Sequence, residues 1–299
     1  NTMTHPLFND FFQGTARSFL RRTIRQALDE DGPDLTSDAL FDPEEPLVAR
    51  VVSKEEAVLA GLPIIPLVLD GACAGNTSCS LDFQVREGAL VTKDGVVVDI
   101  QGPARVLLKA ERVLLNFVSH LSGVATLTSS FVQRLQGSRT RLLDTRKTLP
   151  GLRYPEKYAV LVGGGVNHRL DLAGMLMLKY NHIDRAGSIS LAVERLRRRY
   201  PDCPPIEVEC RTRQEVEEAV RCAVDRIMLD NMDPASMTEA LSLIPGTIES
   251  EISGGVTLDN VAALGGLGAD FISVGCITNS ARAVDLSMRL GPDRNGSAP

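Results

Sequence analysis

The stretch LLDTRKTLPGLR at residues 142–153 places a carboxylate and two cationic side chains directly after a short apolar run. The run has the composition of a buried strand, and a Pro-Gly pair ends it. Charges such as Asp144, Arg146 and Lys147 are rarely placed at the end of a core element without a function, because burial of a charge is costly unless it is paired. The stretch therefore predicts one wall of an anion-binding site.

More cationic side chains follow later apolar runs. Arg169 stands next to His168 in GGGVNHR, and Lys179 follows MLML. Together with Arg146 and Lys147 they are four fixed positive charges, which would repel one another at one rim unless an anion offset them. This pattern predicts a substrate with several negative charges. The alternatives are solvated loop charges, or a Schiff-base lysine of an aldolase-like barrel at Lys147 or Lys179.

Small residues follow the last two apolar runs. Ser253, Gly254 and Gly255 come after the first of them, and Gly275 comes after the second. Residues without bulky side chains let backbone N–H groups approach a phosphate closely, and the start of a following helix adds partial positive charge. The pattern predicts a site for a 5′-phosphate. Glycines of ordinary tight turns are the alternative interpretation.

Two acids, Glu209 and Asp230, end the middle apolar runs IEVE and RIMLD. Paired carboxylates that face a phosphorylated ligand are a usual way of holding Mg²⁺, directly or through water. We therefore expect a magnesium site at these two residues. Glu207 and Glu209 could instead be polar residues of a barrel interior. The sequence has no H-x-x-H spacing, so a catalytic transition-metal site is not expected.

The elements that would position these residues alternate regularly from residue 140 onward. Short apolar runs are followed by amphipathic helical stretches, which is typical of a parallel sheet with crossover helices. The predicted strands are 141–144, 175–178, 206–209, 226–229, 248–252 and 271–274. The predicted helices are 154–162, 189–199, 213–223, 234–243, 257–264 and 281–290. Each polar group above follows a strand, so a barrel or doubly wound sheet would collect them at one rim.

The first hundred residues predict a smaller α+β unit. An amphipathic helix is expected at 11–30, followed by strands at 47–52, 81–85 and 96–100. A long helical pattern then begins after Gly102-Pro103. Its weakest point is Gly123, where we place the boundary between domains.

Composition limits the classes of function. The chain has 299 residues and a formal net charge of −6, which disfavours a surface that seeks nucleic acid or anionic lipid. No apolar stretch reaches the roughly 20 residues needed to cross a bilayer, and no secretion signal is apparent, so a soluble cytoplasmic protein is expected. The six cysteines form no C-x-x-C pair, and His120 reads as a hydrogen-bonded histidine of a core or interface.

Several segments resemble the quinolinate phosphoribosyltransferases, or carboxylating nicotinate-nucleotide pyrophosphorylases. They are DLTS (34–37), GPARVLLKAERVLLNFVSHLSGVATLT (102–128), DTRKTLPGLRYPEKYAVLVGGGVNHR (144–169), LKYNHI (178–183), EVE (207–209), LDN (229–231), SGGV (253–256) and SVGCITNSARAVDLSM (273–288). The resemblance implies an α/β fold: an open, seven-stranded α/β barrel of the type II phosphoribosyltransferase kind with an N-terminal α/β sandwich domain. The implied domains are the sandwich at 1–123, the barrel at 124–281 and a C-terminal helix at 282–299 that packs back on the sandwich.

The resemblance also implies a reaction. Quinolinate and phosphoribosyl pyrophosphate would give nicotinate mononucleotide, pyrophosphate and carbon dioxide in the presence of Mg²⁺, a step in NAD biosynthesis. Lys147, Lys179, Glu209 and Asp230 would be catalytic, with the two acids facing the ribose hydroxyls and Mg²⁺. A related barrel transferase for another aromatic acid, a Schiff-base lyase, or a sensor that binds phosphometabolites without turnover are the alternatives.

The resemblance assigns the remaining contacts as well. Three residues would grip the two quinolinate carboxylates, namely Arg146, His168 and Arg169. The 5′-phosphate would be held by Ser253, Gly254, Gly255 and Gly275. Arg112 matches an arginine that family members insert into the site of a neighbouring subunit, which implies a homo-oligomer, either a dimer or a hexamer. Two positions depart from the family pattern, Tyr180 in place of an acid and Asn279 in place of a histidine.

Overall fold

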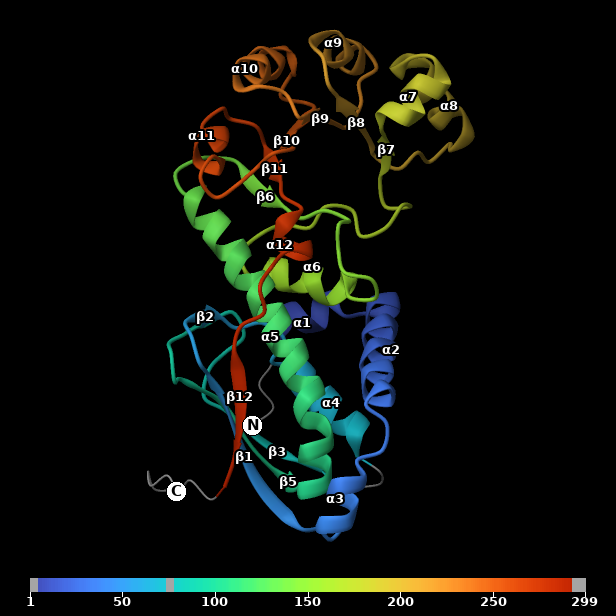
Figure 1. Ribbon diagram of the computed structural model, residues 1–299. Helices are drawn as coiled ribbons and strands as arrows, with labels where there is room; N and C mark the ends of the chain where they lie inside the picture. Colours follow the sequence, from blue (N-terminus) through green and yellow to red (C-terminus); the bar gives the residue numbers. More distant parts are fainter. Residues whose placement is uncertain (1–4, 74–77, 292–299) are drawn as a thin grey trace. The chain divides into compact units, whose positions relative to one another are not determined.

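A computed structural model describes residues 5–73 and 78–291 of the chain (Figure 1). The chain divides into two compact units. The first consists of residues 1–127, 149–163 and 280–299, and the second of residues 128–148 and 164–279. The chain thus passes from one unit to the other several times.

Amphipathic spacing explains the helices of the first unit. In α2 (Gly14–Glu30) the buried residues Ala16, Leu20, Ile24 and Leu28 recur every four positions, so one face packs inward while the arginines stay exposed. The predicted helix at 11–30 is therefore confirmed, with a later start. The other helices with residues in this unit are α1 (Pro6–Phe11), α3 (Leu35–Leu40), α4 (Ile64–Ala72), most of α5 (Ala104–Arg134) and α6 (Arg153–Val162).

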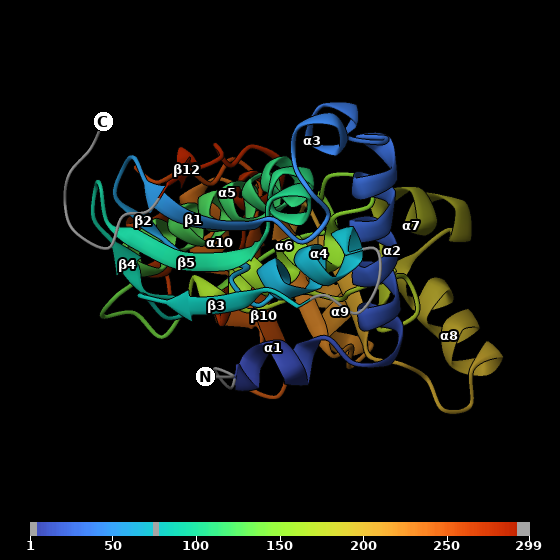
Figure 2. The ribbon, with the colours of Figure 1, turned by 90° about the horizontal axis from the view of Figure 1, so that it is seen from below.

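An antiparallel four-stranded sheet accompanies these helices, and its strands lie in the order β12, β1, β5 and β3 (Figure 2). They are β12 (Leu286–Leu290), β1 (Pro46–Ser53), β5 (Val96–Pro103) and β3 (Ser80–Phe83). A separate two-stranded ribbon pairs β2 (Ala57–Val58) with β4 (Leu90–Val91). The three strands predicted in this part of the sequence are confirmed.

The C-terminal segment corrects one prediction. We expected a helix at 281–290 within a helical tail at 282–299, but Leu286–Leu290 form β12, which pairs antiparallel with β1. The physical reason is the alternation of apolar and polar residues from Val284 to Leu290, which has the period of a strand. The segment joins the first unit as predicted, but as the edge strand of its sheet; residues 292–299 lie outside the described part of the chain.

Gly123 does not interrupt helix α5, which continues from Ala104 to Arg134, and the units meet at residues 127 and 128 instead. A Cβ atom at Gly123 would lie 2.1 Å from the carbonyl oxygen of Arg282. The glycine therefore serves a close approach between the helix and the segment that leads into β12, where any side chain would collide.

The second unit is built on six parallel strands in the order β6, β11, β10, β9, β8 and β7. They are β6 (Arg141–Leu143), β7 (Leu176–Leu178), β8 (Ile206–Cys210), β9 (Arg226–Asp230), β10 (Glu249–Ser253) and β11 (Phe271–Ser273), and each matches a predicted strand. Val166 forms a single parallel bridge with Leu143 at the free edge of β6. This one-residue bridge supplies the seventh position that the sequence analysis did not locate.

Helices follow the strands and lie on the outer side of the curved sheet (Figure 1). They are α7 (Tyr180–Ala186), α8 (Ile189–Arg199), α9 (Arg213–Arg221), α10 (Pro234–Leu243) and α11 (Val261–Gly265), with the short α12 (Cys276–Asn279) after β11. Ser188, Thr212 and Asp233 start α8, α9 and α10 by accepting backbone N–H groups. None of the helices in the described residues has the length and apolar character needed to cross a membrane.

Candidate active site

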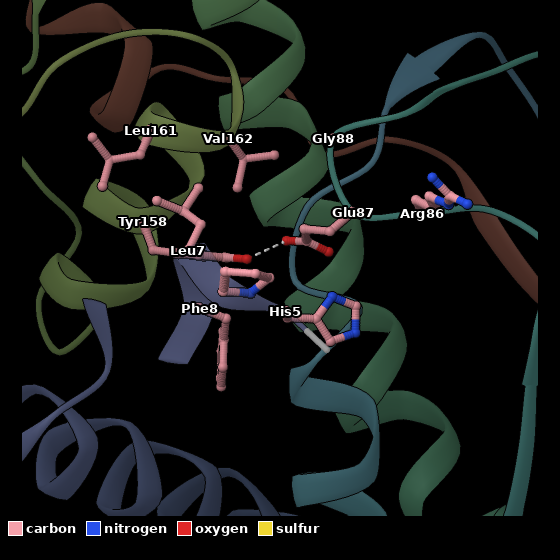
Figure 3. A pocket seen from close by; sticks show the side chains of 10 residues that line it. His5, Leu7, Phe8, Arg86, Glu87, Gly88, Tyr158, Leu161 and Val162 are labelled. Carbon is pink, nitrogen blue, oxygen red and sulfur yellow. Dashed lines mark hydrogen bonds between the residues drawn. The ribbon is translucent and has the colours of Figure 1, made fainter. Parts of the chain in front are cut away.

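A cavity of about 470 Å³ lies in the first unit, and its lining is mostly apolar (Figure 3). Its carboxylate, the half-buried Glu87, already accepts hydrogen bonds from the backbone N–H groups of Gly61 and Leu62 and from the Tyr158 hydroxyl, at 2.7, 2.9 and 2.9 Å. Phe8 packs edge-on against the Tyr158 ring. The hydrogen bonds of this carboxylate thus stabilise the fold of the first unit. Burial raises its pKa to about 7.

A second cavity, of about 510 Å³, lies in the second unit and has a different character. Polar and charged side chains converge on it from the carboxyl ends of the parallel strands. Eight of the twelve predicted site residues line it: Arg146, Lys147, His168, Arg169, Lys179, Glu209, Asp230 and Ser253. The prediction that one rim gathers these residues is confirmed, since ends of adjacent parallel strands meet at the same edge.

The lining carries an excess of positive charge. Four cationic side chains, Arg146, Lys147, Arg169 and Lys179, face two carboxylates, Glu209 and Asp230. Burial lowers the pKa of Arg169, and the neighbouring charge of Arg146 lowers it further. Two guanidinium groups therefore repel each other across this cavity, and an anion bound between them would relieve that repulsion.

Arg169 is held so that part of its guanidinium stays available. Its Nη1 donates to the carbonyl oxygen of Met175 at 2.9 Å, and Nη2 lies 3.7 Å from the sulfur of Met177. The Nε of Arg146 is buried without a hydrogen-bond partner among the described residues. A guanidinium has five N–H donors, so both arginines can still bind a carboxylate in a bidentate manner.

Lys179 is joined to Glu209 by a short ion pair. An ammonium held by a carboxylate is a poor nucleophile, which disfavours a Schiff base at this position. Asp230 lies at the end of the next strand and accepts a hydrogen bond from the side-chain amide of Asn231 at 3.0 Å. Glu209 and Asp230 thus offer hard oxygen atoms from neighbouring strands, which is a suitable donor set for Mg²⁺.

The predicted glycines Gly254, Gly255 and Gly275 follow β10 and β11 and are not among the residues that line the cavity. Gly254 and Gly255 have φ angles of +94° and +61°, which favour glycine. A Cβ at Gly254 would lie 2.2 Å from Oδ1 of Asn231, whereas one at Gly255 would meet no atom within 4 Å. Gly275 lets the Lys147 stem pack closely, because its Cβ would lie 2.9 Å from Cδ of Lys147. The predicted helix after the first two glycines begins only at Val261. Before it, the side chain of Asn260 accepts a hydrogen bond from the backbone N–H of Thr257 in a turn.

Arg112 is the one predicted residue that lies in the other unit. It is exposed on helix α5 and is absent from the cavity lining within the second unit. Its predicted role concerns a neighbouring subunit and stays a prediction. The cavity also contains residues that the sequence analysis did not assign to it, namely Thr145, Met177, Tyr180, Met228, Asn231 and Ser273. Thr145, Tyr180, Asn231 and Ser273 follow or end a strand, so their position was the available signal, whereas Met177 and Met228 lie within β7 and β9.

Asp144 and His168 are both buried, and each contacts neighbouring protein atoms. Asp144 is fully buried and accepts the backbone N–H of His168 at 2.8 Å and the side-chain amide of Asn167 at 2.6 Å. It thereby fixes the segment after Val166. His168 is only 6% exposed, and both of its ring nitrogens face protein atoms. The residue still lines the cavity, and its predicted contact with a carboxylate stays a prediction.

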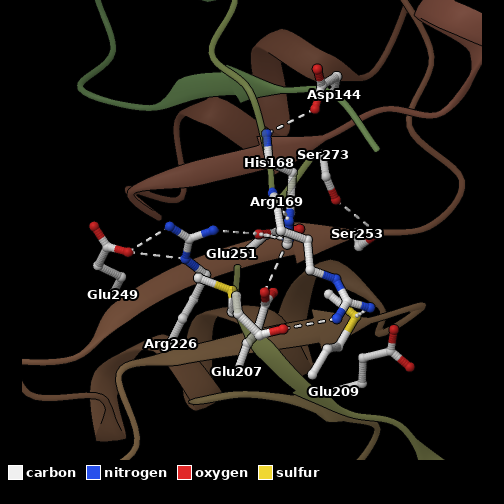
Figure 4. A network of polar contacts seen from close by, with 12 residues as sticks. Asp144, His168, Arg169, Glu207, Glu209, Arg226, Glu249, Glu251, Ser253 and Ser273 are labelled. Atoms are coloured by element: carbon white, nitrogen blue, oxygen red, sulfur yellow. Dashed lines mark hydrogen bonds and ion pairs between the residues drawn. The ribbon is translucent and has the colours of Figure 1, made fainter. Parts of the chain in front are cut away.

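A buried polar network extends from His168 away from the cavity (Figure 4). Nε2 of His168 lies 2.9 Å from Glu207 and 3.6 Å from Glu251, and Glu251 lies 3.5 Å from Arg226. Burial is the main cause that raises the pKa of Glu207 to about 7 and of Glu251 to about 8. The sequence analysis named the barrel interior only as an alternative for Glu207, and the complete burial of this residue agrees with that alternative. The sequence analysis missed Glu251 and Arg226, whose signal was polar residues within otherwise apolar strands.

The expected hydrogen-bonded histidine of the long helix is also confirmed. Nε2 of His120 lies 2.8 Å from Oε1 of Glu156, which is fully buried on α6. The same carboxylate accepts the backbone N–H of Leu149 at 3.1 Å. His120 therefore belongs to the packing of the first unit.

An open parallel α/β barrel with a cationic cavity at the carboxyl ends of its strands defines a class of barrel enzymes that act on anionic small molecules. Two family models locate the chain within that class. The model of the quinolinate phosphoribosyl transferase N-terminal domain matches residues 34–122, and that of the C-terminal domain matches residues 124–289. The chain belongs to the quinolinate phosphoribosyltransferase family.

Individual relatives agree with this assignment. A protein of Synechocystis named "Probable nicotinate-nucleotide pyrophosphorylase (carboxylating)" is 44% identical over 247 residues, which cover 81% of this chain and 82% of the relative. The nicotinate-nucleotide pyrophosphorylase (carboxylating) of Mycobacterium leprae is 38% identical over 277 residues, covering 90% and 96%. The solved structure of the nicotinate-nucleotide pyrophosphorylase from Francisella tularensis superposes with a TM-score of 0.86 at 32% identity, covering 94% of this chain and 99% of that one.

Proposed function

We infer that the chain is a pentosyltransferase that transfers the phosphoribosyl group of phosphoribosyl pyrophosphate to quinolinate, with decarboxylation, in NAD biosynthesis. The observation that carries this inference is the cavity of the second unit, where four cations and two acids line one space. The lining has two positive charges more than negative ones, which matches the two carboxylates of quinolinate. The family and the named relatives support the same reaction.

Arg146 and Arg169 are the proposed carboxylate-binding residues. They approach the cavity from different strand ends, each with unused guanidinium donors. The ammonium groups of Lys147 and Lys179 face the same space and would neutralise the pyrophosphate. Ser253 and the backbone at Gly254, Gly255 and Gly275 would hold the 5′-phosphate. The positive φ angles of Gly254 and Gly255 support this assignment.

The chemistry asks the protein mainly to position and neutralise charged groups. As pyrophosphate leaves, positive charge develops on the ribose, and the pyridine nitrogen attacks the anomeric carbon. Glu209 and Asp230 would orient the ribose hydroxyls and stabilise that charge. The cationic ring then accepts the electron pair of the departing carbon dioxide, and the vacated ring carbon takes up a proton.

Glu209 and Asp230 are also the residues that would hold Mg²⁺, as their oxygen donors and common cavity fit a hard cation. When bound, the ion supplies charge neutralisation for the pyrophosphate. For Glu209 this role requires release from Lys179, because the same carboxylate now pairs with that ammonium.

The direct test compares quinolinate with nicotinate as acceptors, in the presence of phosphoribosyl pyrophosphate and Mg²⁺. We expect one nucleotide, one pyrophosphate and one carbon dioxide per quinolinate, and no comparable turnover of nicotinate, which has one carboxylate fewer for the clamp. Preferential use of nicotinate, or no turnover of quinolinate, would refute the proposal. Borohydride treatment with a carbonyl substrate should trap neither Lys147 nor Lys179.

We further propose that the enzyme works in the cytoplasm as a homo-oligomer, a dimer or a hexamer, to whose neighbouring site Arg112 contributes. The exposure of Arg112 on α5 supports this role. Mixing inactive Arg112→Ala subunits with inactive Arg169→Ala subunits should restore part of the activity, because some sites then combine two intact residues. If the mixture stays inactive although subunits exchange, Arg112 does not act across subunits.

A further inference from the structure

The cavity of the first unit holds one carboxylate among mostly apolar walls (Figure 3). Its volume of about 470 Å³ is in the range of sites that bind small molecules. Leu7 and Phe8 line it from α1, and Leu161 and Val162 line it from the end of α6. Glu87 joins them from the loop between β3 and β4. All of these residues belong to the first unit, so the cavity is formed within one compact body.

The hydrogen bonds of Glu87 leave one acceptor position of its carboxylate unused. A carboxylate offers about four lone-pair positions to donors. Oε1 accepts the backbone N–H of Gly61 at 2.7 Å and the Tyr158 hydroxyl at 2.9 Å. Among the described residues, Oε2 accepts one donor, the backbone N–H of Leu62 at 2.9 Å. One lone pair of Oε2 therefore remains for a donor that enters the cavity.

The charge of this carboxylate has no cationic partner within residues 5–73 and 78–291. The groups that favour its ionised form are two backbone N–H groups and one hydroxyl, and none of them is charged. Arg86, the preceding residue, is exposed and forms no ion pair with Glu87 in this part of the chain. His5 also lines the cavity, but burial lowers the pKa of its imidazole below the ordinary value of 6.5, so the ring is neutral at pH 7. Ionised Glu87 is therefore a negative charge without a counter-ion.

We propose that this cavity is a binding site for a small organic monocation, an amine with one protonated nitrogen on an apolar body, whose N–H group pairs with Oε2 of Glu87. The apolar walls at Phe8, Leu161 and Val162 bury the body of the ligand, and the carboxylate balances its charge. An anion does not fit, because ionised Glu87 repels it. A dication does not fit either, because its second charge would lie unpaired among apolar side chains.

This inference goes beyond the proposed function. Quinolinate and phosphoribosyl pyrophosphate are anions, and their proposed site is the cavity of the second unit. The cavity of the first unit selects the opposite charge, so the two cavities bind different classes of small molecule.

Binding of such a cation is coupled to the protonation of Glu87. Burial raises the pKa of this carboxyl to about 7, so half of the ligand-free protein carries a proton there at pH 7. The cation binds the ionised form, so each binding event releases about half a proton at pH 7, and affinity rises between pH 6 and pH 8. The other titratable groups of the described lining keep their charge near pH 7: His5 is neutral, Arg86 is charged, and a raised pKa keeps the Tyr158 hydroxyl protonated.

The test titrates phenethylamine, which is protonated at pH 7, and its neutral analogue 2-phenylethanol into the full chain. Calorimetry at pH 7 in two buffers with different ionisation enthalpies gives the affinity and the number of protons released. We expect the wild-type protein to bind the amine roughly tenfold or more tightly than the alcohol, the equivalent of one charge-assisted hydrogen bond, with release of about half a proton.

Two variants separate the charge from the cavity. Glu87→Gln keeps the volume of the side chain and removes its charge, so the preference for the amine and the release of protons should disappear while the alcohol still binds. Val162→Phe leaves the carboxylate in place and fills the space, so both ligands should bind more weakly. Val162 is half-exposed, so this variant also serves as a second route if Glu87→Gln does not fold.

Glu56→Gln is the matched control, because Glu56 is an exposed carboxylate of the same unit and does not line the cavity. This variant should bind the amine as the wild-type protein does. An excess of quinolinate should not displace the amine. Equal affinities of the wild-type protein for amine and alcohol, no binding of the amine, displacement by quinolinate, or unchanged binding in both Glu87→Gln and Val162→Phe would overturn the inference. A lack of quinolinate turnover would refute the proposed function alone.

Discussion

Lys179 and Glu209 form an ion pair at the carboxyl ends of the neighbouring strands β7 and β8. Both side chains line the cavity, so the pair neutralises one cation and one acid of the proposed site before any ligand arrives. A carboxylate or pyrophosphate that binds Lys179 must compete with Glu209, and a metal ion that binds Glu209 must compete with Lys179. We therefore expect the pair to couple ligand binding at Lys179 to metal binding at Glu209.

Glu209→Gln tests that coupling. The change leaves Lys179 without its charged partner and removes one negative charge from the cavity, so we expect quinolinate to bind a few-fold more tightly at low salt. Turnover should fall at least about a hundredfold, because a group proposed to face the ribose is neutralised. Calorimetry and steady-state kinetics measure the two effects. Weaker quinolinate binding in this variant would contradict the coupling.

Arg146→Ala and Arg169→Ala should each weaken quinolinate binding by ten- to a hundredfold or more. Each change removes charge-assisted hydrogen bonds that contribute about 1.5 to 3 kcal/mol apiece. Arg198→Ala is the control, since Arg198 is exposed on α8 and pairs only distantly with Glu194 at 3.9 Å. Normal turnover of quinolinate by either clamp variant would show that the arginine has another role.

Gly254→Ala should impair both folding and phosphoribosyl pyrophosphate binding. A side chain there faces an unfavourable φ of +94° and a Cβ contact of 2.2 Å with Asn231, so a destabilisation of about 1 to 3 kcal/mol and a raised KM are expected. Gly268→Ala separates the two causes, because its φ is +84° but no atom lies within 4 Å of the new Cβ. Equal melting temperatures for both variants would mean that the contact with Asn231 yields at no cost.

Stability should fall as the pH rises from about 4.5 to about 8. Burial raises the pKa of Glu87 to about 7 and that of Glu251 to about 8, from an ordinary value of 4.5. The folded state therefore binds more protons than the unfolded state within this range. The stability that these two protonated groups contribute is fully present below pH 4.5 and is lost as the pH rises through their pKa values in the folded state.

Thermal melting between pH 5 and pH 8 measures this dependence. Glu251→Gln cannot ionise at that position, so its melting temperature should fall less steeply with pH than that of the wild-type protein. The matched comparison is Asp259→Asn at an exposed position, which should leave the slope unchanged. Identical slopes in all three proteins would show that Glu251 does not hold its proton.

The rim of the second unit was predictable because local rules determine it. Short strands alternate with helices, parallel strands end at one edge, and chain order alone then gathers Arg146, Lys179 and Asp230 there. The buried network was not predictable in the same way. Glu207 and Glu251 lie on strands that are far apart in the sequence, and only the packed barrel reveals that both contact the ring of His168.

The prediction of a helix for the C-terminal segment was wrong for a related reason. Both a helix and a strand could be read from 281–290, and the free edge of β1, more than two hundred residues away, decides between them. Gly123 was interpreted as a weak point of a helix because of its low helix propensity. The structure shows instead that the glycine lets the backbone of Arg282 approach the helix closely. Non-local pairing overrides local preference at both positions.

The pairing of β12 with β1 also bears on how the protein is made. During synthesis, residues 46–53 leave the ribosome long before residues 286–290, so the hydrogen-bonding edge of β1 waits with no partner strand through most of translation. The sheet can close only after the intervening barrel has been synthesised, and such distant contacts make closure slow. A nascent chain at this stage exposes one unpaired edge of β1, and such an edge can pair with other chains.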